Sequence, residues 1–306
     1  MTTLAHPLWR PSSGCGPDCL PRPGETPTVP AVQQLGRAIA LLGMLGLGIG
    51  VAAVLPVLPS RERRTLTSGW ARATARACGV RLKVRGRLPR RRALLVANHV
   101  SWWDILALLA VAPARLVAKH EVRRWPLVGL LARAGGTVFV DRTRPRQLPA
   151  TVGRVAAALR AGRCVAVFPQ GTTWCETAAA CRPRPGFRPA MFQAAIDTGA
   201  PVVPIRIGYR CAVTGESTTA PAFLGDETLL RSVRRVLALR QLTVTVEITA
   251  PLHPSRRADR RALARVAEAA VHPLIRPLAR PAAADVSELP LARPAAADVS
   301  ELPLAA

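Results

Sequence analysis

The sequence is poor in lysine, in acidic residues and in aromatic residues. Only Lys83 and Lys119 are lysines, so almost all of the 43 basic residues are arginine, set against 18 acidic residues and a net charge of +25. Such a charge favours an anionic partner: a membrane surface, a phosphate-bearing substrate or nucleic acid. Aromatic residues make up only 4% and include a single tyrosine. A surface that stacks bases needs more of them, so we expect lipid and no nucleic acid as partner.

Complete metal-binding and nucleophile motifs are also missing. Cys15 and Cys19 lie close together, but no second Cys/His pair follows nearby to complete a zinc site. Cys164 lies in an apolar run that is typical of a buried thiol. The chain contains no Gly-x-Ser-x-Gly elbow, which disfavours an enzyme nucleophile. We therefore predict no metal, no cofactor and no disulfide, in a reducing compartment.

Composition divides the chain into four parts. Residues 1–34 contain seven prolines, which predicts a flexible arm, and residues 35–60 are apolar. Residues 61–275 are expected to form one domain, because 49% hydrophobic residues in a 306-residue chain can build a large core. Residues 276–306 contain a 13-residue segment repeated letter for letter, which predicts a disordered tail.

The apolar part has three interpretations. Residues 38–58 carry no charge, and 21 residues of helix would reach ~30 Å, the thickness of a hydrocarbon core. A span or membrane-inserted helix, a buried helix of a soluble domain and a signal peptide all fit this pattern. The late start disfavours a signal peptide, so we expect a helix in the cell membrane. Arg61, Arg63 and Arg64 follow directly, which predicts a cytoplasmic location for the domain.

From about residue 80 the pattern alternates between short β-rich runs and helical runs. This alternation predicts an α/β fold, a mostly parallel or mixed sheet flanked by helices. The predicted strands are 80–85, 93–97, 137–140, 164–168, 202–207 and 242–249. The predicted helices are 102–111, part of 121–134, 147–161, 188–198, 226–239 and 256–274.

A histidine and an aspartate follow the predicted strand 93–97. The carboxyl ends of strands in an open α/β sheet form the crevice where ligands bind, so His99 is well placed as a general base. Ser101 is the expected N-cap of the next helix, and the Asp104 carboxylate in its first turn can reach back to the imidazole. The alternative is a capping box, in which Asp104 only serves the helix end. Both roles are compatible.

Anion-binding groups follow two further strands. Arg142 comes after the predicted strand 137–140, and the turn at 168–172 offers backbone N–H groups and hydroxyls after the strand 164–168. A guanidinium fork together with such donors suits a phosphate. Taken singly, Arg142 is better explained as a solvated surface charge, and 168–172 as an ordinary turn.

The order of these stretches resembles the glycerolipid acyltransferase family, which includes the 1-acylglycerol-3-phosphate acyltransferases. The resemblance rests on His99 and Asp104 with four residues between them, then 136–142, then 168–172, then Val203-Pro204-Ile205. It covers roughly residues 61–269. It implies an α/β acyltransferase domain anchored to a membrane near its N-terminus, with acyl-CoA or acyl carrier protein as donor and a lysophospholipid hydroxyl as acceptor.

The resemblance also implies roles for individual residues. His99 would be the general base and Asp104 its orienting partner, with Pro204 near the acyl pocket. The sequence departs from the usual pattern at Gln170, where a glutamate is expected, and at Thr173, often an arginine. The acceptor is thus 1-acylglycerol-3-phosphate or another lysolipid such as lyso-ornithine lipid, unless the chain is an impaired lipid-binding homologue. The implied acceptor-site residues are Lys119, Gly136, Arg142, Phe168, Pro169, Gln170, Gly171 and Thr172.

Overall fold

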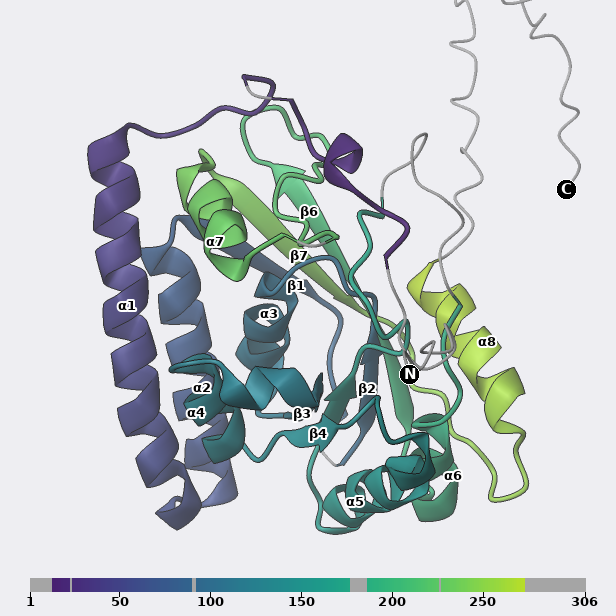
Figure 1. The fold of residues 1–306 in the computed structure, drawn as a ribbon. Helices are drawn as coiled ribbons and strands as arrows, with labels where there is room; N and C mark the ends of the chain where they lie inside the picture. Colours follow the sequence, from purple (N-terminus) through teal and green to yellow (C-terminus); the bar gives the residue numbers. More distant parts are fainter. Residues whose placement is uncertain (1–12, 23, 90–91, 177–185, 226, 273–306) are drawn as a thin grey trace, which may run out of the picture. The chain divides into compact units, whose positions relative to one another are not determined.

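The computed structural model describes residues 13–22, 24–89, 92–176, 186–225 and 227–272. A seven-stranded sheet in the order β1-β7-β6-β2-β5-β3-β4 carries helices on both faces (Figure 1). All neighbouring strands are parallel except β6 and β7, which are antiparallel. This confirms the predicted α/β fold with a mixed, mostly parallel sheet. The strands are β1 (Val80–Arg85), β2 (Leu94–Ala97), β3 (Arg115–Lys119), β4 (Val138–Val140), β5 (Val165–Val167), β6 (Val202–Cys211) and β7 (Leu242–Ile248).

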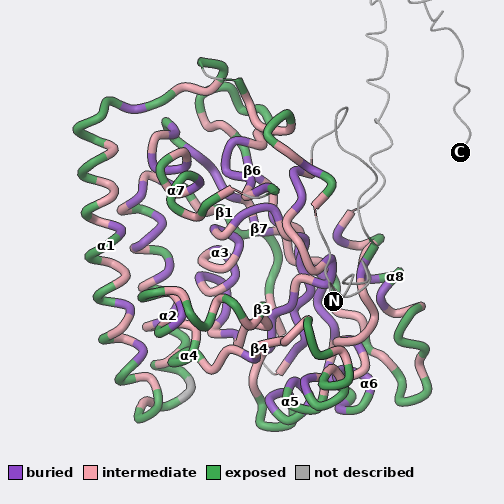
Figure 2. Tube along the Cα trace, viewed as in Figure 1, coloured by how far each residue is buried: buried purple, intermediate pink, exposed green. Residues whose placement is uncertain are grey.

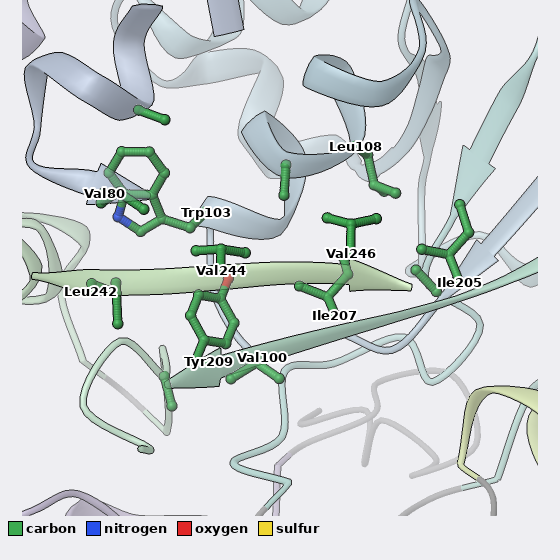
Figure 3. Packing of buried hydrophobic residues seen from close by; sticks show 14 of the residues in the cluster. Val80, Val100, Trp103, Leu108, Ile205, Ile207, Tyr209, Leu242, Val244 and Val246 are labelled. Carbon is green, nitrogen blue, oxygen red and sulfur yellow. The ribbon is translucent and has the colours of Figure 1, made fainter. Parts of the chain in front are cut away.

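The central strands β2 and β5 are buried on both faces of the sheet, and alternate side chains along β2 point to opposite faces. Leu95 and Ala97 belong to the apolar cluster on the face covered by α3 and α7, whereas Leu94 and Val96 belong to the cluster under α5, α6 and α8. Strands covered on both sides have continuous apolar sequences, which is why β2 and β5 were recognisable. Figure 3 shows Trp103 of α3 packed beside β7 within the first cluster.

Two elements escape the sequence prediction. β3 is short and bounded by Arg115 and Lys119, so its apolar run is too brief to signal a strand. Helix α2 buries a face of small side chains, Ala71, Thr74 and Ala75, which a search for large apolar residues does not detect. The helices are α1 (Ala31–Val54), α2 (Ser60–Ala77), α3 (Trp103–Val111), α4 (Val128–Ala134), α5 (Leu148–Arg160), α6 (Phe192–Thr198), α7 (Leu229–Ala238) and α8 (Arg260–Val271).

The described part of the proline-rich arm is packed onto the domain, which corrects the expectation of a flexible segment. The Val29 N–H donates to the Ala238 carbonyl at 2.9 Å, and the Arg240 N–H donates to the Pro27 carbonyl at 2.8 Å. Cys15 is only 3% exposed. These backbone hydrogen bonds offset the conformational entropy that the segment loses when it becomes ordered, and the composition alone does not reveal them. Residues 1–12 and the predicted tail 276–306 lie outside the described residues.

Helix α1 packs against α2 along one side and leaves an apolar side open. Gly48 lies against the Trp70 ring, where a Cβ would come within 2.7 Å of a ring carbon, and the Trp70 indole N–H donates to the Met44 carbonyl at 2.8 Å. Within the described residues, the segment from α1 to Val57 is the one helix long and apolar enough to cross a membrane. Its outer side remains exposed (Figure 2). The exposed apolar residues of α1 are Val32, Leu35, Ile39, Leu42, Leu47 and Val54.

We expect the outer side of α1 to govern lipid binding. Leu35, Ile39 and Leu42 are each at least 61% exposed, so replacing all three by glutamate should leave the melting temperature within a few degrees. Binding to phospholipid vesicles, measured by flotation, should fall about 100-fold, since each side chain contributes about 1 kcal/mol of apolar burial. The control Val266→Glu, on α8 and 53% exposed, should bind as the parent chain does. Equal vesicle binding by the parent chain, the triple variant and Val266→Glu would contradict this role of α1.

Candidate active site

The His99 imidazole and the Asp104 carboxylate form a close pair between β2 and α3. His99 lies two residues beyond the end of β2, and Asp104 is the second residue of α3. His99 Nδ1 lies 2.8 Å from Asp104 Oδ2, with the histidine side chain 20% exposed and the aspartate side chain fully buried. A carboxylate accepts a hydrogen bond, so Nδ1 carries the proton in this pair. Nε2 is then the ring nitrogen that can accept a proton.

The Asp104 carboxylate serves both the histidine and the chain entering the helix. Its Oδ2 also accepts backbone N–H bonds from Val100 at 2.7 Å and Ser101 at 2.9 Å. The two roles that the sequence left open, orienting the base and capping the turn, are therefore compatible in one side chain. The N-cap is Trp102, not Ser101 as the sequence suggested, because the helix begins one residue later.

Tyr209 of β6 completes the shell around Asp104 and was not found from the sequence. Its hydroxyl donates to Asp104 Oδ1 at 2.5 Å. Burial and the adjacent carboxylate raise the pKa of the Tyr209 hydroxyl well above its ordinary value, so it stays a donor at neutral pH. Figure 3 shows its ring among the core side chains of β6 and β7. Only its status as the single tyrosine could have drawn attention to it.

The loop after β5 holds His99 by its ring and by its backbone. The Phe168 ring stacks on the imidazole with centroids 3.9 Å apart. The His99 N–H donates to Gln170 Oε1 at 3.1 Å, and the His99 carbonyl accepts from the Trp174 N–H at 2.7 Å. Gly171 has a φ of +77°, which a side chain would disfavour, so the turn requires glycine there.

Gln170 and Thr173 have positions that the sequence did not suggest. Gln170 is fully buried and lies outside the lining of the cleft described below, and its side-chain oxygen accepts the His99 N–H. Its Nε2 has no hydrogen-bond partner among the described residues. The Thr173 hydroxyl donates to the Phe223 carbonyl, which ties the loop to the segment before α7. Both departures from the usual pattern thus concern how the loop is held.

A large cleft of about 2800 Å³ brings the other predicted residues together with His99. Asp104 lies beneath it, fully buried. Apolar side chains from α1, α3 and α4 also line the cleft, including Leu41, Leu45, Leu109 and Leu131, so it has room for a hydrocarbon chain. The predicted residues in its lining are Lys119, Gly136, Arg142, Phe168, Pro169, Gly171 and Thr172.

Arg142 has a cationic neighbour that sequence analysis missed. Burial lowers the pKa of the Arg142 guanidinium, the carboxylate of Glu121 opposes this shift, and the charge of Arg188 adds to it. Arg188 lies in the segment before α6 and lines the same cleft. An anion bound in the cleft within reach of both guanidinium groups would be stabilised by their two positive charges. Lys119 also lines the cleft, and its ammonium lies 5.6 Å from the centroid of the Trp125 ring.

Comparisons with known proteins show which family the chain resembles. The family model described as "Acyltransferase" matches residues 81–208. A lyso-ornithine lipid O-acyltransferase of Pseudomonas aeruginosa is 35% identical over 77% of this chain and 91% of its own length. A 1-acyl-sn-glycerol-3-phosphate acyltransferase of Neisseria gonorrhoeae is 34% identical over 56% of this chain and 64% of its own length.

A solved structure extends the agreement to the fold. The crystal structure of the 1-acyl-sn-glycerophosphate acyltransferase from Thermotoga maritima superposes with a TM-score of 0.56, covering 78% of this chain and 92% of that one at 21% identity. The fold, the relatives and the family model thus agree with the resemblance inferred from the order of motifs. The chain belongs to the glycerolipid acyltransferase family and is an acyltransferase of the lysophospholipid type.

Proposed function

We propose that the chain transfers a fatty acyl group to the sn-2 hydroxyl of 1-acylglycerol-3-phosphate, giving phosphatidic acid. The observation that carries this proposal is that Arg142 and Arg188 line the same cleft as His99. A phosphate monoester presents three oxygens and up to two negative charges, which suits two guanidinium forks. The apolar lining accommodates hydrocarbon chains in the same cleft.

His99 acts as general base in this proposal. Nε2 takes the proton of the acceptor hydroxyl while its oxygen attacks the thioester carbonyl, and the C–O bond forms. Collapse of the tetrahedral intermediate breaks the C–S bond, and the imidazolium returns the proton to the departing sulfur. Asp104 stabilises the imidazolium and fixes the ring through Nδ1. The donor, acyl-CoA or acyl carrier protein, is a co-substrate, and we assign no resident cofactor.

We further propose that the domain works at the cytoplasmic side of the cell membrane. The exposed apolar side of α1 would lie in lipid. The α2 arginines, among them Arg61, Arg63 and Arg64, would remain with the anionic cytoplasmic surface. Because α1 packs on α2, α4 and α7, it stays with the domain. This supports a helix that lies along the membrane surface over one that crosses the bilayer.

A second acceptor is favoured by a separate observation. The Pseudomonas relative, whose name specifies lyso-ornithine lipid, matches a larger share of this chain than the Neisseria relative does. Lyso-ornithine lipid carries a carboxylate, which a single guanidinium binds through two hydrogen bonds. With lyso-ornithine lipid as acceptor, one of the two arginines, Arg142 or Arg188, would contribute less to acceptor binding.

The first test is acyl transfer by the full-length chain in detergent micelles with a labelled thioester donor. We expect product with 1-acylglycerol-3-phosphate, and His99→Ala should lower kcat by ~10²–10⁴-fold because the base is lost. The control His253→Ala changes an exposed histidine and should have the parent rate. Transfer to lyso-ornithine lipid alone would decide for the second acceptor, and an undiminished His99→Ala rate would refute the mechanism.

The second test separates the acceptors through Arg142. Arg142→Gln should raise KM for 1-acylglycerol-3-phosphate about tenfold, since a charge-assisted contact of about 1.4 kcal/mol is lost. KM for the thioester donor should change little. The matched control Arg146→Gln removes an exposed arginine four residues away and should leave both constants unchanged. An unchanged acceptor KM in Arg142→Gln would remove the phosphate site from this position.

The third test concerns Tyr209 as a positioning residue. Tyr209→Phe removes the donor to Asp104 Oδ1 but keeps the ring in the core, so kcat should fall about threefold to tenfold. KM for both substrates should change little, because the substitution alters the support of the imidazole and not the lining of the cleft. A lower melting temperature with an unchanged kcat would show that Tyr209 only stabilises the core.

A further inference from the structure

Three cysteines from distant parts of the chain meet outside the active site. Cys15 lies just before the short 3-10 turn Pro17–Cys19 of the N-terminal arm, and Cys19 is the last residue of that turn. Cys175 lies in the loop after β5. Their Sγ atoms all lie within 4.8 Å of one another, and the Sγ atoms of Cys15 and Cys175 are 3.4 Å apart. Sequence spacing could not reveal this group, because the third cysteine follows 160 residues after the first.

We propose that Cys15, Cys19 and Cys175 bind a zinc ion. In a tetrahedral site with Zn–S bonds of about 2.3 Å, neighbouring sulfurs lie ~3.8 Å apart. The observed separations lie on both sides of this value. Three residues separate Cys15 from Cys19, which is within the spacing of ligand pairs in structural zinc sites. Thiolates are soft ligands, which disfavours magnesium and calcium.

The surroundings of the cluster suit a bound dication. Cys15 and Cys175 are 3% and 2% exposed, so thiolates here would be costly without a compensating charge. Burial raises the pKa of the Cys15 thiol, and the charge of Cys19 adds to this shift, while the backbone N–H of Cys175 lowers it. A zinc ion would offset two of the three thiolate charges, and N–H donors to sulfur, which stabilise the remaining charge, are the outer partners that such sites use.

Cys175 is disulfide-bonded in the structure, which corrects the expectation of no disulfide drawn from the sequence. Only the thiolate form of Cys175 can hold the metal. A thiol reductant supplies the two electrons and two protons that turn the disulfide into thiols, and zinc then displaces protons from the ligand sulfurs. The metal-bound and disulfide forms of Cys175 are therefore alternatives. A reducing compartment would favour the metal-bound form, and an oxidising one the disulfide.

The consequence is a fixed link between the N-terminal arm and the loop that holds the general base. Trp174, next to Cys175, donates its N–H to the His99 carbonyl, and the Thr173 hydroxyl bonds the Phe223 carbonyl. Zinc would keep this loop in place through Cys175, next to the residue that bonds the His99 carbonyl. The site is structural in this proposal, and it does not depend on which lysolipid is acylated.

The test is the zinc content of the full chain, produced in zinc-supplemented medium and purified in micelles with a reductant. Elemental analysis should find about one zinc per chain. The zinc content should be at least about tenfold lower than that of the parent chain in each of the variants Cys15→Ser, Cys19→Ser and Cys175→Ser. The control Cys211→Ser alters a half-buried cysteine outside the cluster and should keep the full content.

A second measurement covers the case in which a serine variant fails to fold. A mercurial thiol reagent added to the intact parent chain should release the zinc to a chromogenic chelator. Cobalt in place of zinc should give the intense absorption of thiolate-to-metal charge transfer. A reduced, folded parent chain without zinc would overturn the proposal, as would full zinc retention in folded Cys15→Ser and Cys175→Ser.

Discussion

The arrangement of the active site depends on one buried charge, the carboxylate of Asp104. A carboxylate with no exposed surface is tolerated only when donors surround it, and this one has four: the His99 ring, the N–H groups of Val100 and Ser101, and the Tyr209 hydroxyl. Three of them come from the turn between β2 and α3, but the fourth comes from β6. The turn and β6 must therefore be in register before the base can be oriented.

The register is set next to the site by Asn98. Its side-chain amide donates to the Ile207 carbonyl and accepts from the Ile207 N–H, so it continues the β2–β6 pairing for one more step. Tyr209 is two residues further along β6 and faces the same side as Ile207. The β2–β6 pairing thus fixes where the Tyr209 hydroxyl lies relative to the turn that holds Asp104.

Sequence analysis succeeded where the signal is local and failed where residues meet across the fold. His99 and Asp104 share one turn, so their spacing sufficed, and continuous apolar runs revealed β2 and β5. Arg188, Tyr209 and Cys175 gain their neighbours only from the topology, which the spacing of residues does not encode. The charge of +25 was also only partly informative. Arg37 and Arg235, for example, donate to backbone carbonyls near α7, so some of the arginines hold the fold together.

The close packing of Gly48 on Trp70 affects how lipid substrates reach the active site. It joins α1 to α2, and α2 packs in turn on α3, the helix that begins beside His99. In the proposed arrangement on the membrane, these contacts hold the imidazole at one height above the lipid. Acceptors would then arrive by lateral diffusion within the leaflet, without leaving it. Turnover at such a surface is governed by the mole fraction of lysolipid among its neighbours, not by its concentration in the bulk solution.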